Sequence, residues 1–230
     1  MAFAFIAYIL FFVIAAISYY VQHSFQKKFK KYSRKSLGVN MTGKDVAERM
    51  LHDYGVTDVK VNFTRGSLSD HYNPATKTVN LSEAVFATNS IAAAAVAAHE
   101  CGHAIQHATG YSPLKMRSAL VPVVSFASTW MQWILLIGIL TIQFFPPILG
   151  VGVVLFAFTT LFSFITLPVE INASVRAVKW LEASGLTYGQ TTSDAKDALK
   201  SAAYTYVVAA LSSLATLFYY VMILVGRNRD

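Results

Sequence analysis

Hydrophobic residues are concentrated in three stretches that contain no charged side chain, at residues 2–21, 118–169 and 201–226. A helix that crosses a membrane needs about 20 consecutive apolar residues, so the first and last stretches each fit one span. The middle stretch is too long for one span, and Pro146 and Pro147 interrupt it, because consecutive prolines cannot continue a helix. The pattern predicts transmembrane helices at residues 2–21, 118–142, 147–168 and 203–225.

The polar segment at residues 22–117 has the shorter periodicities of a small α+β unit. "VTDVKVNF" alternates between apolar and polar residues, which predicts a strand, and "LSDHYNPATKTVNLS" predicts two extended pieces around an Asn73-Pro74 turn. "KTVNLS" is either an ordinary strand or an edge strand that pairs with an extended peptide. Ser90 predicts the start of an alanine-rich helix at residues 91–109. With residues 169–202 as a further helical segment, the fold class is mainly α: four transmembrane helices and a small α+β unit.

Charged residues make up 13% of the 230 residues, about half of the roughly 25% found in soluble domains. Basic residues in the loops set the orientation of membrane helices. The segments 22–117 and 169–202 carry 13 and four Lys and Arg residues, whereas the turn between the second and third spans carries none. The sequence therefore predicts a multi-pass protein of the cell inner (plasma) membrane. Both polar segments are expected in the cytoplasm, and both chain ends outside.

No basic residue precedes the first apolar stretch, so a retained membrane anchor is favoured over a cleaved signal peptide. Six basic residues follow that stretch in "QKKFKKYSRK", which is typical of a cytoplasmic flank and compatible with binding of anionic lipid head groups. A short basic segment next to a bilayer argues against nucleic acid as a partner. The single cysteine, Cys101, excludes an internal disulfide.

Candidate chemistry is concentrated in "VAAHECGHAIQHATG", within the predicted helix at residues 91–109. A helix turns by about 100° per residue, so His99 and His103 lie one turn apart on one face, with Glu100 beside them. This H-E-x-x-H pattern is typical of zinc-dependent hydrolysis. Two imidazoles hold Zn²⁺, and the carboxylate moves a proton from water to the leaving amine. Merely solvated histidines are less favoured on a helix of this apolar character. We predict one Zn²⁺ per chain, with Glu100 as the catalytic base and acid.

A catalytic zinc site needs a third protein ligand. His107 lies on the same stripe but about 12 Å beyond His99, so three histidines of one straight helix cannot meet at one ion. Cys101 points to the other side of the helix and is expected in the core. Glu170 ends the longest uncharged stretch, and an ionisable group at a membrane boundary usually has a partner. Its alternative role is a favourable charge at a helix start. The loop charges place Glu170 on the same side of the membrane as His99 and His103, which favours it as the third ligand.

A tetrahedral intermediate needs a hydrogen-bond donor in addition to the metal. Arg176 is slightly favoured because it follows Glu170 by about two helical turns, although a structural role is the simpler account of each candidate taken alone. The candidates of suitable type in suitable segments are Arg176, His71 and Tyr206, together with Tyr72 and Tyr204.

Several stretches resemble the YugP-type "putative neutral zinc metallopeptidase" family of bacterial membrane proteins, namely "LSDHYNPATKTVNLS", "SIAAAAVAAHECGHAIQHATGYSPLKMRS", "LPVEINASVRAV" and "AAYTYVVAALSS". At greater distance the chain is similar to the HtpX-like and prenyl-protein-protease membrane gluzincins, in which the first residue of E-x-x-A-D supplies the third ligand. "EINAS" matches at Glu170 and Ala173 but has Ser174 in place of the aspartate. This leaves open which group, Asn172 or another, orients a ligating histidine. The resemblance implies a gluzincin-like catalytic unit and a zinc-dependent endopeptidase.

Together these features predict a membrane-embedded zinc endopeptidase that is active at the cytoplasmic face, with His99, His103 and Glu170 as metal ligands. The expected partners are the lipid bilayer and polypeptide substrates in or near the membrane. The alternative is a non-proteolytic zinc-binding membrane scaffold. An ion transporter is not favoured, because the polar residues of the predicted spans are limited to Ser, Thr, Gln and Tyr.

Overall fold

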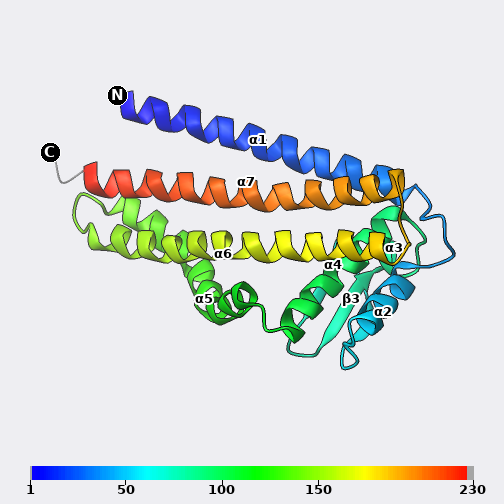
Figure 1. The fold of residues 1–230 in the computed structure, drawn as a ribbon. Coiled ribbons are helices and arrows are strands. Elements are labelled where there is room, and N and C mark those ends of the chain that lie inside the picture. The colour runs from blue at the N-terminus through cyan, green and yellow to red at the C-terminus, as the bar shows by residue number, and fades with distance from the viewer. Residues whose placement is uncertain (1, 227–230) are drawn as a thin grey trace. The chain divides into compact units, whose positions relative to one another are not determined.

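The computed structural model describes residues 2–226, except for the side chains of residues 2–8 and 10, and most of the described residues are helical. The chain forms two compact units. Of the described residues, an all-helical unit comprises 2–20, 115–167 and 206–226, and a mixed unit comprises 21–114 and 168–205. The elements follow one another as α1 (Ala2–Ser33), α2 (Gly43–Asp53), β1 (Lys60–Thr64), β2 (His71–Asn73), β3 (Thr78–Ser82), α3 (Glu83–Phe86), α4 (Ile91–Ala108), α5 (Ser112–Leu140), α6 (Pro147–Ala183) and α7 (Gln190–Gly226) (Figure 1).

Three helices of the described chain, α5, α6 and α7, are long and apolar enough to cross a membrane. The predicted first span lies within α1, but the side chains of residues 2–8 and 10 are outside the described part of the chain, and the span stays a prediction. Turns replace helix at residues 141–146, and Pro147 begins α6, where the missing N–H of proline is tolerated. The helices extend beyond the predicted spans, because α6 continues through Pro168 and α7 already starts at Gln190.

The mixed unit is built on a three-stranded sheet in the order β1-β3-β2, with β1 parallel and β2 antiparallel to β3. Val79 and Leu81 of β3 are buried in the core that α2 and α4 share, and Figure 1 shows these two helices beside the strand. The ordinary-strand interpretation of "KTVNLS" is confirmed, and the edge-strand alternative is wrong. The turn after Asn73 places β2 on one side of β3, while β1 pairs with the other side.

Helix α4, which carries the H-E-x-x-H pattern, starts where the sequence predicts. The Ser90 hydroxyl accepts a hydrogen bond from the Ala93 N–H at 3.1 Å, which satisfies one of the amides that a helix start leaves unpaired. Gly110 follows the helix at a φ of 66°, a conformation that glycine adopts without strain. The alanines at residues 92–95 and 97–98 are buried, so neighbouring elements approach α4 closely. Glu100, His103 and Gln106 of α4 are buried as well, whereas His107 is exposed.

Candidate metal centre

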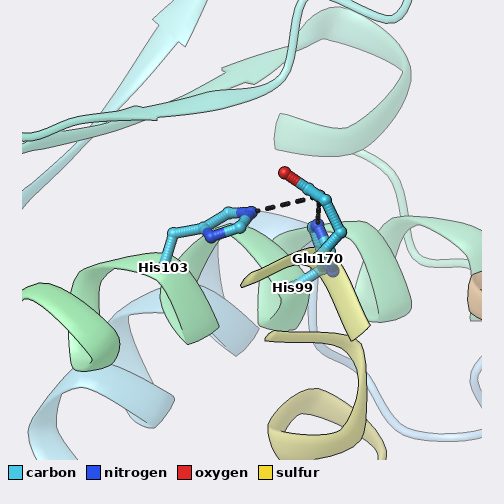
Figure 2. Close-up of side chains that lie close together, drawn as sticks. All are labelled: His99, His103 and Glu170. Carbon is cyan, nitrogen blue, oxygen red and sulfur yellow. Dashed lines mark hydrogen bonds and ion pairs between the residues drawn. The ribbon is translucent and has the colours of Figure 1, made fainter. Parts of the chain in front are cut away.

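Two helices of the mixed unit bring together the titratable side chains that the sequence singles out. His99, Glu100 and His103 lie on α4, and Glu170 lies on α6. Glu170 Oε2 is 3.3 Å from His99 Nε2 and 3.5 Å from His103 Nε2, and both rings approach the carboxylate (Figure 2). His103 and Glu170 are almost fully buried, at 8% and 3% exposure. Within the described residues, His99, His103 and Glu170 are the one group of three or more such side chains that could hold a metal ion.

The donor atoms of this group fit a zinc ion. Two imidazole nitrogens and one carboxylate oxygen form a usual ligand set of catalytic zinc, in which a fourth position stays open. Zinc binds such atoms at about 2.0–2.2 Å, so two ligands of a tetrahedral ion are about 3.4 Å apart. The two separations from Glu170 are close to this value, and all three donor atoms lie within 4.8 Å of one another.

The charges of the group favour a positive partner for Glu170. Burial acts to raise the pKa of the Glu170 carboxyl, but hydrogen bonds from His103 and His99 hold that pKa well below its ordinary value. Burial acts to lower the pKa of His103, but its hydrogen bond to Glu170 and the charge of Glu100 raise that pKa overall. A buried carboxylate is costly without a cation beside it. A bound metal ion or a protonated imidazole can supply that charge.

Each histidine has a hydrogen-bond partner on Nδ1, the ring nitrogen that does not contact Glu170. Ser174 Oγ is 3.1 Å from His99 Nδ1, and Gln106 Oε1 is 3.0 Å from His103 Nδ1. Partners of this kind orient metal-binding imidazoles and select the nitrogen that carries the proton. The serine that replaces the aspartate of the E-x-x-A-D pattern therefore contacts a candidate ligand, His99, itself.

The described hydrogen bonds of the Asn172 side chain do not involve either histidine. Its Oδ1 accepts hydrogen bonds from Gln106 Nε2 at 3.0 Å and from Arg176 Nε at 2.8 Å. Gln106 is the residue that sequence reasoning missed. Its position three residues after His103 is the available signal, because residues at that spacing are neighbours on a helix.

Glu100 is buried, and strand β2 sets its orientation. The backbone N–H of Tyr72 donates a hydrogen bond to Glu100 Oε2 at 3.0 Å. Tyr72 lies on an edge strand of the sheet, and its hydroxyl is 2.7 Å from His107 Nδ1. Burial raises the pKa of Tyr72 further above its ordinary value, which already keeps the hydroxyl protonated at neutral pH. Glu100 is thus held at a fixed place beside the two histidines of α4.

The two candidate ligands that their spacing disfavours lie outside the clustered donors. His107 contacts Tyr72 and does not belong to the group of three. Cys101 is fully buried, and its thiol donates to the Ala47 backbone oxygen at 3.5 Å, which confirms its predicted place in the core. Burial also raises the pKa of Cys101 well above its ordinary value, which disfavours the thiolate that metal binding needs.

The three candidate transition-state stabilisers lie on three different elements. His71 contacts the Ser69 backbone oxygen and Asn80, and it is exposed on β2. Arg176 is on α6, where its Nε donates to Asn172. Tyr206 belongs to the all-helical unit. A catalytic role for any of the three stays a prediction.

A glycine allows the two ligand-bearing helices to approach each other. A Cβ atom added at Gly102 would lie 2.8 Å from the backbone oxygen and 3.1 Å from the Cα of Ala173. Both distances are shorter than ordinary contacts, and a backbone cannot rotate aside as a flexible side chain does. Gly102 lies next to His103, and Ala173 lies one helical turn after Glu170. The contact between these two small residues therefore allows the candidate ligands of the two helices to lie close together.

Comparison with known proteins identifies a family and a relative that cover nearly the whole chain. Residues 7–225 match the model of a family described as "Putative neutral zinc metallopeptidase". The chain is also 40% identical over 224 residues to "Putative membrane protease YugP" of Bacillus subtilis (strain 168), an alignment that covers 96% of this chain and 99% of that relative. No solved structure matches the chain.

Proposed function

Because the chain belongs to the family described as "putative neutral zinc metallopeptidase", we propose that it is a membrane-embedded, gluzincin-type endopeptidase whose active site lies at the cytoplasmic face. The observation that carries this proposal is the convergence of His99 and His103 from α4 with Glu170 from α6. The H-E-x-x-H helix alone is a sequence pattern. Its meeting with a buried carboxylate from a distant helix creates a donor set for one zinc ion.

Each residue of the site has a defined part in this proposal. His99, His103 and Glu170 hold the ion, and Ser174 and Gln106 orient the two imidazoles. When bound, zinc acts as a Lewis acid that activates water and polarises the scissile carbonyl.

Glu100 supplies the proton transfer. The Tyr72 N–H binds one oxygen of its carboxylate, which fixes the side chain without neutralising it. The carboxylate takes a proton from the attacking water and passes it to the leaving amine as the peptide bond breaks. Burial of Glu100 keeps bulk water from competing for that proton.

The test of this function is hydrolysis that depends on the metal. Full-length protein in detergent, loaded with one Zn²⁺ per chain, is expected to cleave an unfolded polypeptide such as casein. Removal of zinc with a chelator should reduce cleavage to background, and added Zn²⁺ should restore it. A protein that binds zinc tightly but cleaves neither casein nor itself would instead support the non-proteolytic scaffold.

The proposed membrane arrangement comprises spans at residues 2–21, 118–142, 147–168 and 203–225, with residues 22–117 and 169–202 in the cytoplasm. The long apolar helices α5, α6 and α7 and the basic residues of both polar segments support it. Substrates are then membrane proteins or chains close to the inner leaflet, because the site lies in segments that emerge directly from the spans.

Single cysteines introduced into a Cys101→Ala background test this orientation. Phe144 in the turn before α6 and Tyr188 in the loop before α7 are well exposed, at 88% and 74%. In intact cells, Phe144→Cys should react with a membrane-impermeant maleimide, whereas Tyr188→Cys should react only after lysis. The reverse labelling pattern would place the site outside the cell.

A further inference from the structure

A fully buried glutamine connects the two ligand-bearing helices. Gln106 of α4 has no exposed surface, and its side chain makes three hydrogen bonds with described residues. Its Nε2 donates to the Val169 backbone oxygen at 2.8 Å and to Asn172 Oδ1 at 3.0 Å, both on α6. Its Oε1 lies 3.0 Å from His103 Nδ1. The amide therefore joins a metal-binding histidine to the helix that supplies the third ligand.

Two independent partners determine which way this amide points. The Val169 backbone oxygen can only accept a hydrogen bond, so the Gln106 atom that faces it is the NH₂ group. The Arg176 guanidinium can only donate, so the Asn172 atom that faces it at 2.8 Å is the oxygen. That oxygen in turn requires a donor from Gln106. Both constraints leave Gln106 Oε1, an acceptor, opposite His103.

The orientation of the amide has a consequence for the histidine. An acceptor at 3.0 Å from His103 Nδ1 requires that Nδ1 carry the proton. In the neutral ring the lone pair then lies on Nε2, the nitrogen directed at Glu170. We infer that Gln106, held by Asn172 and Arg176, is a positioning residue that selects the metal-binding tautomer of His103. This role rests on the proposed zinc site.

The tautomer of the other histidine, His99, is not determined in this way by its partner on Nδ1. The partner of His99 Nδ1 is the hydroxyl of Ser174, which can either donate or accept. His99 can therefore adopt either tautomer without losing this hydrogen bond. Selection by the protein falls on His103, which explains why a long polar side chain is kept fully buried between two helices despite the cost of burying polar groups.

Replacement of Gln106 by methionine tests the role, because methionine has similar length but cannot accept from His103. In full-length, detergent-solubilised protein, Gln106→Met is expected to weaken Zn²⁺ binding about 10- to 100-fold, as loss of an orienting partner typically does. The affinity is measured by competition with a chelating dye. Ile105→Met is the matched control, because Ile105 is also buried on α4 and its apolar side chain cannot accept a hydrogen bond from a histidine. This control should bind Zn²⁺ as the unmodified protein does.

A second pair of variants tests whether Asn172 holds Gln106 in place, in case Gln106→Met does not fold. Asn172→Asp keeps acceptors for both Gln106 and Arg176, whereas Asn172→Leu removes them. Asn172→Leu should therefore lose much more Zn²⁺ affinity than Asn172→Asp.

Equal affinities of Gln106→Met and Ile105→Met, or of the two Asn172 variants, would overturn the role of Gln106 and leave the proposed zinc site intact. Unmodified protein that binds no Zn²⁺ would overturn the proposed site, and the role of Gln106 with it.

Discussion

Replacement of Glu100 by glutamine is expected to abolish peptide hydrolysis while one Zn²⁺ per chain stays bound. The Tyr72 N–H donates to Glu100 Oε2 at 3.0 Å, and the carbonyl oxygen of glutamine can accept the same bond. The side chain should therefore keep its place on α4. An amide cannot take a proton from water at neutral pH, however, so the general-base contribution, about 10²- to 10⁴-fold, should be lost from the rate.

The measurement is kcat for an unfolded substrate, compared at equal zinc content. Glu83→Gln is a suitable control, because Glu83 is exposed in the first turn of α3 and the same charge is removed there. Its kcat should equal that of the unmodified protein. Undiminished hydrolysis by Glu100→Gln would remove Glu100 from the mechanism. Loss of zinc from that variant would show instead that Glu100 holds the ion or its ligands.

The local features of the site were predictable because they depend on periodicity and spacing. Ser90 predicts the start of α4, and the spacing of His99 and His103 predicts that they share one helix face. The exclusion of His107 follows from helix geometry alone. Glu170 was found from its place at the end of an uncharged stretch, and the structure brings its carboxylate to both imidazoles. Each of these inferences needs only a few neighbouring residues or the sign of the loop charges.

The remaining features depend on contacts between segments that are distant in sequence. The pairing of β3 on both sides cannot be predicted from "KTVNLS" itself. One partner, β2, precedes it across the Asn73-Pro74 turn, but the other partner, β1, lies earlier in the chain and runs parallel to β3. In the sequence, Gln106 is one polar residue of a helix. Its role depends on Val169 and Asn172 of α6, which accept hydrogen bonds from its amide. The need for glycine at position 102 likewise follows only from the close approach of the Ala173 backbone. Tertiary packing decides the roles of such positions, because spacing along one helix identifies only their neighbours on that helix.

The buried Glu170 would couple zinc binding at the proposed site to the packing of α4 against α6. Glu170 is 3% exposed and its carboxylate lies between two imidazoles, so its negative charge destabilises the packing of α4 against α6 when no cation is present. A zinc ion shared by both helices removes that cost. Zinc should consequently stabilise the mixed unit against unfolding as well as supply the chemistry.

Replacement of Glu170 by alanine is therefore expected to have the largest effect on zinc binding. Its Oε2 lies 3.3 Å and 3.5 Å from the two histidine nitrogens. Among the described residues, α4 itself supplies no third donor to this group. Removal of a direct ligand should cost more than the roughly 10- to 100-fold loss that removal of an orienting partner causes. Zinc content after dialysis should fall to near zero, and hydrolysis with it.

His107→Ala is the matched comparison for Glu170→Ala, because His107 is the other candidate for a third ligand and lies two turns beyond His99 on α4. Its ring contacts the Tyr72 hydroxyl at 2.7 Å and stands outside the clustered donors. His107→Ala should retain full zinc occupancy, although the altered position of Tyr72 can lower kcat through Glu100. Full occupancy in Glu170→Ala together with zinc loss in His107→Ala would assign the third ligand to the histidine. The bend in α4 that such an assignment requires is incompatible with one regular helix from Ile91 to Ala108.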